Sequence, residues 1–155
     1  MPDRSLPQLD ELYKEIILDH YREPHGRIPL ERVDLQALGM NPLCGDEVKL
    51  SVQVKDKKIE KVHIEGHGCS ISVASGSMLA DILCNKTLEE ASQVSSYLKE
   101  MMHGRNEKKN GKKIDIGDLE ALEGVKKFPV RIKCALLPWM TFEEAIVGHN
   151  KVEIS

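Results

Sequence analysis

The sequence predicts an α+β fold in a single domain over residues 1–155. Three observations support this. An apolar stripe at helical spacing lies near the N-terminus, a period-two alternation follows at residues 48–54, and helical spacing returns from residue 70 onward. No internal repeat or heptad array interrupts this order. A small antiparallel sheet is therefore expected between one N-terminal helix and a helical second half.

The first predicted helix covers Leu9–Tyr21, where apolar residues recur every three or four positions. Pro24 and Gly26 end it, because proline and glycine both disfavour a continuing helix. Residues 28–40 show mixed signals and little periodicity. We interpret them as extended chain that leads to Cys44.

A β-hairpin is predicted next. Apolar residues alternate with polar ones over Val48–Val54, which is typical of a half-buried strand. Asp56-Lys57-Lys58 forms a plausible turn, and Ile59–Ile64 supplies the partner strand. The alternation slips once between Ile59 and Val62, which predicts a β-bulge.

Two helices are predicted in the middle of the chain. Residues 70–84 carry apolar side chains on one face. Thr87-Leu88-Glu89-Glu90 is a capping box that opens the next helix, which runs through Met102 and ends at Gly104. A polar, lysine-rich loop is expected over residues 105–113.

The C-terminal third is predicted to hold three further helical segments. Residues 115–125 form one of them. Pro129 suits the first turn of a helix that carries Cys134 to about Leu137, where Pro138 limits it. Thr141–Glu144 is a second capping box and predicts a final short helix.

Composition excludes several classes of protein. A net charge of −3 and a pI near 6.1 argue against a general nucleic-acid binder. No run of 18 apolar residues could span a membrane, and the first residues lack a secretory-signal pattern. We therefore expect a cytoplasmic protein, in which four cysteines are thiols or metal ligands rather than disulfides.

Three cysteines and one carboxylate form a candidate metal site. Cys44 lies in a Pro-x-Cys-Gly turn, Cys69 between a strand end and a helix start, and Cys134 early in a helix. Cys69 and Cys134 are thus expected near helix N-termini, where a thiolate is favoured. Asp46 lies two residues beyond Cys44. Three thiolates and one carboxylate fill a tetrahedral zinc site.

Other interpretations of these residues stay open. The cysteine separations are far longer than those of zinc knuckles, so spacing alone is a weak signal. Free cysteine is often a small buried apolar residue, and Asp46 could serve only its own turn. Cys84 falls on an apolar helical stripe and is expected in the core. His63 and His67 flank the Cys69 segment as possible supporting donors, whereas the remaining histidines are expected at the surface or in the core: His20, His25, His103 and His149.

Four segments together resemble the U-type iron–sulfur cluster assembly family, which includes IscU and the NifU N-terminal region. They are LYKEIILDHYREP (12–24), NPLCGD (41–46), GHGCSISVAS (66–75) and RIKCA (131–135). In the IscU scaffold branch a histidine directly precedes the third cysteine, where this chain has Lys133. The segment at about 105–122 is similar to the insertion of the SufU branch, so the resemblance is closest to SufU.

The resemblance implies a three-stranded antiparallel sheet packed against helices. It implies zinc held by Cys44, Asp46, Cys69 and Cys134, and a sulfurtransferase activity in which Cys44 accepts persulfide sulfur from a SufS-type cysteine desulfurase. In the family picture, a histidine of that pyridoxal-phosphate enzyme takes the place of Cys44 on zinc. Further iron–sulfur assembly proteins are possible downstream partners.

Arg131 lies one helical turn before Cys134, so both side chains can share a face. We expect Arg131 to orient the anionic site or to pair with an acidic group of the desulfurase; the alternative is a solvent-facing arginine. Two other functions remain open for the whole chain. One is an IscU-type scaffold that assembles an iron–sulfur cluster, and the other is a structural zinc domain without sulfur chemistry.

Overall fold

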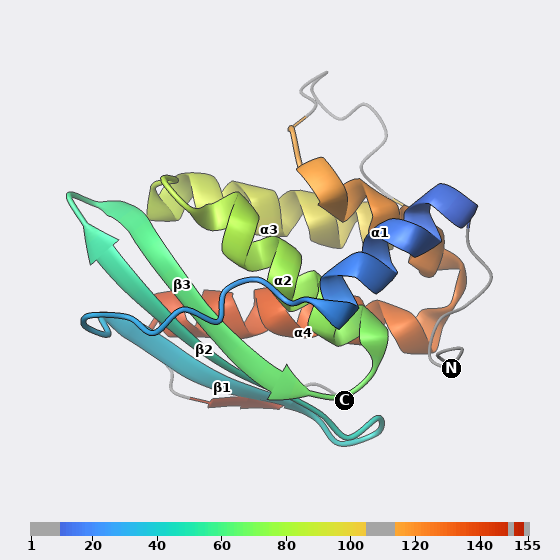
Figure 1. Cartoon of the computed structure of the whole chain (residues 1–155), viewed down its shortest axis with the longest axis horizontal. Coiled ribbons are helices and arrows are strands. Elements are labelled where there is room, and N and C mark those ends of the chain that lie inside the picture. The colour runs from blue at the N-terminus through green and yellow to red at the C-terminus, as the bar shows by residue number, and fades with distance from the viewer. Residues whose placement is uncertain (1–9, 105–113, 149–150, 154–155) are drawn as a thin grey trace.

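The computed structural model describes residues 10–104, 114–148 and 151–153 (Figure 1). The predicted order of one helix, a sheet and a helical second half is confirmed. The elements are α1 (Glu11–Arg22), β1 (Leu35–Asn41), β2 (Asp46–Lys55), β3 (Lys58–His67), α2 (Ser70–Leu83), α3 (Leu88–Met102), the 3₁₀ helix η2 (Gly117–Lys127), α4 (Pro129–Ile146) and β4 (Lys151–Glu153). The predicted loop at residues 105–113 and His149 lie outside the described residues.

The sheet has the strand order β3-β2-β1-β4. β1, β2 and β3 form the expected three-stranded antiparallel part, and β4 adds a short strand parallel to β1. Asp56 and Lys57 both have positive φ, which is typical of a tight hairpin turn. The predicted bulge is confirmed, because Gln53 pairs with Lys61 while Val54 pairs with Ile59, leaving one extra residue on β3.

The interpretation of residues 28–40 as extended chain was incomplete, because β1 begins at Leu35. The residues of β1 that point into the protein are small or polar: Ala37, Gly39 and Asn41. A Cβ atom on Gly39 would lie 1.9 Å from the Thr141 hydroxyl oxygen, so α4 packs directly on the strand backbone. This close packing removes the apolar alternation that marks a strand in sequence.

The predicted break at Pro138 was wrong. α4 is one continuous helix from Pro129 to Ile146, with Pro138 inside it. Trp139 and Phe142 beyond the proline are fully buried, and their burial outweighs the loss of one backbone hydrogen bond. The Thr141 hydroxyl donates to the Leu137 carbonyl at 2.7 Å and does not cap a new helix.

The helices form a layer over one face of the sheet, with α2 against β3 and α4 against β1 and β2 (Figure 1). α1, α3 and η2 pack on that layer from outside. The predicted capping box of α3 is present in full. None of the described helices has the length and hydropathy needed to cross a bilayer. The largest fully buried side chains between the layers include Leu50, Ile71, Met78, Leu79, Trp139 and Phe142.

Candidate metal centre

Three remote segments meet at one end of the sheet. Cys44 lies in the loop between β1 and β2, Cys69 immediately before α2, and Cys134 in the second turn of α4. Figure 1 shows that the β1–β2 loop and the junction of β3 with α2 lie at the same end of the sheet. The fold therefore brings together the residues that the sequence singled out as candidate ligands.

Two distances between these side chains match those of a tetrahedral zinc site. The Sγ atoms of Cys134 and Cys44 are 3.7 Å apart, and Cys69 Sγ is 3.7 Å from Asp46 Oδ2. The donor atoms of Cys44, Asp46 and Cys134 all lie within 4.8 Å of one another. Tetrahedral zinc with Zn–S bonds near 2.3 Å and Zn–O bonds near 2.1 Å requires about 3.8 Å between sulfurs and about 3.6 Å between sulfur and oxygen. The group of Cys44, Asp46 and Cys134 thus fits zinc, and Cys69 lies outside that group, next to Asp46.

Asp46 is fixed by the backbone around Cys69. Its side chain is buried, and Oδ1 accepts a hydrogen bond of 2.8 Å from the Cys69 amide. The approach is so close that a Cβ atom on Gly68, which has φ +145°, would lie 2.1 Å from Asp46 Oδ1. Glycine at position 68 is therefore a requirement of the Asp46 geometry.

Asn41 holds the Cys44 loop and was missed as a functional candidate in the sequence. Its carbonyl accepts hydrogen bonds from the amides of Cys44 and Gly45, and its own side chain is buried. The Asn41 Nδ2 group donates to Cys44 Sγ at 3.7 Å, while Oδ1 accepts from the Leu43 amide. An asparagine directly before a Pro-x-Cys-Gly turn was the signal for this role.

The thiols of Cys69 and Cys134 share a hydrogen bond that shifts their pKa values in opposite directions. The hydrogen bond from Cys134 lowers the pKa of Cys69 to about 7, against the opposing effect of burial. The same hydrogen bond, followed by burial, raises the pKa of Cys134. The expectation that both thiols are activated by helix N-termini is thus met only by Cys69, the N-cap of α2. Cys134 lies beyond the first turn of α4.

Arg131 is half-buried, and its guanidinium lies beside the thiols. Burial lowers the pKa of Arg131, yet the hydrogen bond to Cys134 and the negative charges of Cys69, Cys134 and Cys44 raise that pKa overall. The guanidinium is therefore part of the electrostatic environment of the site. The alternative of a purely solvent-facing arginine is disfavoured by this contact.

The other candidates lie outside the site. Cys84 ends α2 and is half-buried rather than part of the core, and burial raises the pKa of its thiol. His67 is exposed and His63 half-buried; neither imidazole hydrogen-bonds to Asp46 or to a cysteine among the described residues. Among the described residues, no hydrogen bond supports the expected role of these two histidines beside the ligands.

The sequence matches a known protein family over most of its length. The model of the NifU-like N-terminal domain matches residues 12–135, which include all four candidate ligands. The chain belongs to this family. The resemblance found in the four sequence segments is thereby confirmed.

Two curated members of the family cover nearly the whole chain. The zinc-dependent sulfurtransferase SufU of Bacillus subtilis is 42% identical over 92% of this chain and 94% of its own length. The scaffold protein IscU of Streptococcus pyogenes is 39% identical over 92% of this chain and 87% of its own length. The crystal structure of FiSufU from Fervidobacterium islandicum AW-1 aligns with TM-score 0.72 at 36% identity, covering 85% of this chain and 94% of that one.

Proposed function

We propose that the chain is a zinc-dependent sulfurtransferase that accepts persulfide sulfur from a SufS-type cysteine desulfurase for iron–sulfur cluster biogenesis. The observation that carries this proposal is the convergence of the Cys44, Asp46 and Cys134 donor atoms within 4.8 Å, with the Cys69 thiol 3.7 Å from Asp46 and Cys44 on a loop. The 42% identical SufU relative supports the same assignment.

The proposed ligands are Cys44, Asp46, Cys69 and Cys134. Zinc bound there would keep Cys44 deprotonated and masked until a histidine of the docked partner replaces it. Four anionic donors leave the loaded site negatively charged, so exchange of one thiolate for a neutral imidazole lowers charge repulsion. Arg131 lowers that repulsion further from the protein side.

Cys44 is the proposed acceptor because its displacement disturbs least. Asp46 and Cys134 are buried, and half-buried Cys69 is joined to Asp46 through its amide, whereas half-buried Cys44 lies in a loop beside Leu43, which is 73% exposed. The Asn41 amide donates to the Cys44 sulfur and keeps it oriented when it is released. Leu43 offers the partner an apolar contact next to the reacting sulfur.

The transfer step conserves electrons and atoms. The Cys44 thiolate attacks the outer sulfur of the desulfurase persulfide, a new S–S bond forms at Cys44, and the old S–S bond breaks. The desulfurase cysteine leaves as a thiolate, and the sulfane sulfur now resides on this chain. Arg131 lies beside the thiols, where its charge stabilises the persulfide anion.

Several further parts of the proposal concern the setting of this reaction. It takes place in the cytoplasm, where thiols stay reduced, and the sulfur passes on to other iron–sulfur assembly proteins.

Residues 1–155 form one domain with an insertion at about 105–122. Of that insertion the structure describes residues 114–122, in which η2 begins and Leu119 and Leu122 are buried.

The alternative function is an IscU-type scaffold on which a cluster is assembled, favoured by the 39% identical IscU relative. Metal analysis of the purified protein separates the two. The proposal expects a colourless protein with about one zinc per chain, by the four-ligand count. A brown protein with stoichiometric iron and sulfide would support the scaffold instead.

A desulfurase assay tests the acceptor role directly. Cys44→Ala should abolish stimulation of the desulfurase by this chain, while Cys84→Ala, which alters a thiol outside the site, should leave stimulation at the wild-type level. Mass spectrometry should find the added sulfur on Cys44. Stimulation that survives in Cys44→Ala would remove Cys44 from the acceptor role.

A further inference from the structure

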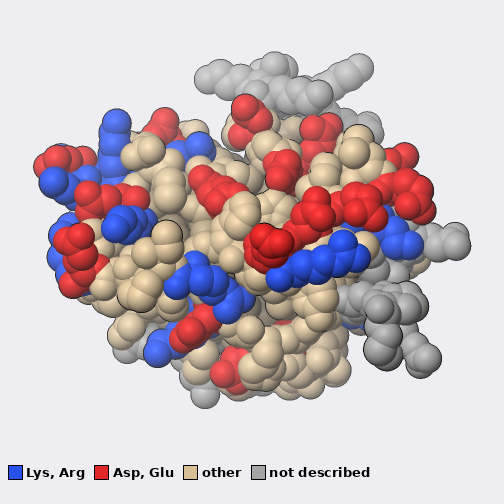
Figure 2. Space-filling view, in the orientation of Figure 1, with Lys and Arg blue, Asp and Glu red and all other residues tan. Residues whose placement is uncertain are grey.

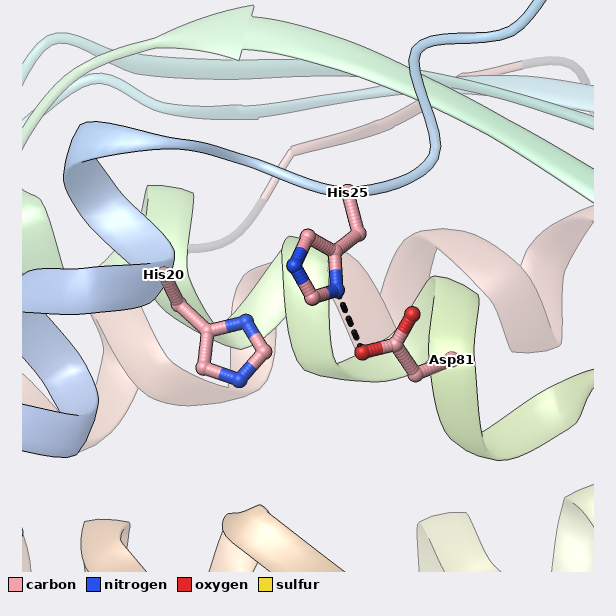
Figure 3. A group of neighbouring side chains, drawn as sticks. All are labelled: His20, His25 and Asp81. Atoms are coloured by element: carbon pink, nitrogen blue, oxygen red, sulfur yellow. Dashed lines mark hydrogen bonds and ion pairs between the residues drawn. The ribbon is translucent and has the colours of Figure 1, made fainter.

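A second cluster of metal-binding side chains lies where α1 meets α2. His20 belongs to α1, His25 follows that helix, and Asp81 lies on α2; one ligand atom from each lies within 4.8 Å of the others. Asp81 is twelve residues along α2 from Cys69, about 18 Å at 1.5 Å per residue, so this cluster is separate from the thiols. Figure 3 shows both imidazoles turned toward one space beside Asp81.

We propose that His20, His25 and Asp81 form a second site for a divalent transition-metal ion of the zinc class. Two imidazoles and one carboxylate are the ligands of many three-residue zinc sites, in which water takes the fourth position. The proposal does not depend on the function assigned to the thiols.

His20 is held in the form that a metal ligand needs. Its Nε2 atom lies 2.9 Å from Asp118 Oδ2, and its Nδ1 atom lies 2.7 Å from Ser77 Oγ. Because the carboxylate accepts the Nε2 proton, we assign the lone pair to Nδ1, with the Ser77 hydroxyl donating to it. A ligating imidazole usually donates its other N–H to a carboxylate. Asp118 already supplies that partner.

His25 combines a fixed backbone with an adjustable side chain. Its amide donates to Ser77 Oγ at 2.8 Å, and the carbonyl of Gly26 accepts from the Ile64 amide at 2.8 Å. The imidazole Nδ1 lies 2.5 Å from Asp81 Oδ2, and these two side chains are 51% and 49% exposed. The two imidazole rings are 4.9 Å apart between centroids.

The spacing requires only a small contraction on metal binding. Ligand atoms bound tetrahedrally at about 2.0–2.1 Å lie about 3.3 Å from one another. Because the ligand atoms lie no more than 4.8 Å apart, each pair must approach by at most about 1.5 Å when the metal binds. Rotamer changes of the exposed His25 and Asp81 side chains cover that distance while the buried His20 stays in place.

The surroundings favour a cation and give it access. An open surface groove is lined by His20, His25 and Asp118, together with Asp19, Arg22 and Glu23. Figure 2 shows acidic side chains gathered over α1, which carries Glu11, Glu15 and Asp19. A groove with this excess of carboxylates raises the local concentration of divalent cations.

Equilibrium dialysis of the full chain against zinc, followed by elemental analysis, tests the site. Wild-type protein should bind one more ion per chain than His25→Gln, whatever number the thiols hold. His103→Gln alters another exposed histidine, outside both clusters, and should keep the wild-type count. Titration with Co²⁺ gives a second readout, because only thiolate-bound cobalt shows strong sulfur-to-metal charge-transfer bands. His25→Gln should leave those bands unchanged.

Two further variants protect the test against a folding defect at one position. Asp81→Asn should also lose the additional ion, and Asp118→Asn should weaken its binding by about 10–100-fold without changing the saturated count. The proposal is overturned if His25→Gln and Asp81→Asn bind as many ions as wild type with equal affinity. It is equally overturned if wild-type protein binds no ion beyond those that the thiols hold.

Discussion

Gly68→Ala should damage the candidate metal centre without altering any proposed ligand. A Cβ atom at this position would lie 2.1 Å from Asp46 Oδ1 and 2.7 Å from Asp46 Cγ, whereas real Cβ contacts essentially never fall under 3.0 Å. The carboxylate must therefore move by roughly 1 Å, the difference between those limits, or the backbone of residue 68 must shift. Either movement breaks the hydrogen bond of 2.8 Å between Asp46 and the Cys69 amide.

The magnitude follows from two costs. Holding alanine at φ +145° costs about 1–3 kcal/mol of backbone strain, and loss of a hydrogen bond to a carboxylate costs about 1.5–3 kcal/mol. We expect the metal-free variant to lose about 2.5–6 kcal/mol in free energy of unfolding, measured by urea denaturation. In chelator competition its zinc affinity should fall by about 10–100-fold, as it does when groups that orient a ligand are altered.

Gly104→Ala is the matched control. Gly104 also has positive φ, but no atom of the described residues lies within 4 Å of the added Cβ, so this variant serves as the control for backbone strain. A double-mutant cycle with Asp46→Ala isolates the clash with the carboxylate, because that part of the cost disappears when the carboxylate is absent. If Gly68→Ala retains zinc like wild type and is no less stable than Gly104→Ala, the inferred Asp46 geometry is wrong.

Three other predictions concern the chemistry of the site. Arg131→Ala should reduce stimulation of a cysteine desulfurase while zinc content, read by elemental analysis, stays constant; loss of zinc would make the role of Arg131 structural. Leu43→Ser should raise the desulfurase concentration needed for half-maximal stimulation at unchanged zinc content, and unchanged coupling would exclude Leu43 from the contact surface. In metal-free protein, alkylation of Cys69 should increase as pH rises through about 7, because its folded-state pKa is lowered to that value, while Cys134 stays protonated and unreactive. Peptide mass spectrometry at graded pH checks this, and equal pH profiles for both thiols would contradict it.

Sequence patterns predicted the fold wherever one face of an element is apolar and the other polar. β2, β3, α2 and α3 meet that condition, and even the bulge in β3 was visible as a slip in the alternation. β1 does not meet it, because α4 packs so closely that Gly39 is needed on the buried face. The short β4 pairs with β1 at the far edge of the sheet, a long-range contact that local periodicity does not encode.

At Pro138 the sequence predicted a helix end that the structure does not have. Local rules end a helix near proline, yet α4 continues because Trp139 and Phe142 gain full burial on the far side. Thr141 matches the sequence of a helix cap, but its hydroxyl donates to a carbonyl of the same helix. Tertiary packing decided both positions, and a window of sequence contains no information about that packing.

The thiols were predictable as a group, whereas their differences were not. Residue type and setting made Cys44, Asp46, Cys69 and Cys134 candidates, but only the structure gives Cys69 the lowered pKa and Cys134 the raised one. This difference in pKa depends on the hydrogen bond between Cys69, the N-cap residue of α2, and Cys134 of α4. The contribution of Asn41 depends likewise on one side-chain contact to Cys44 Sγ.

The four proposed ligands differ in how they are anchored, which suits a site that releases one of them and keeps its shape. Buried Asp46 accepts a hydrogen bond from the Cys69 amide at the N-cap of α2, and Cys134 is buried in α4, so these residues are anchored to elements of the core. Cys44 lies in a loop, where its amide and sulfur hydrogen-bond to Asn41, and its sulfur also lies 3.7 Å from Cys134 Sγ. Under the proposed function, exchange at Cys44 would leave the other three proposed ligands in position, as a reversible sulfur acceptor requires.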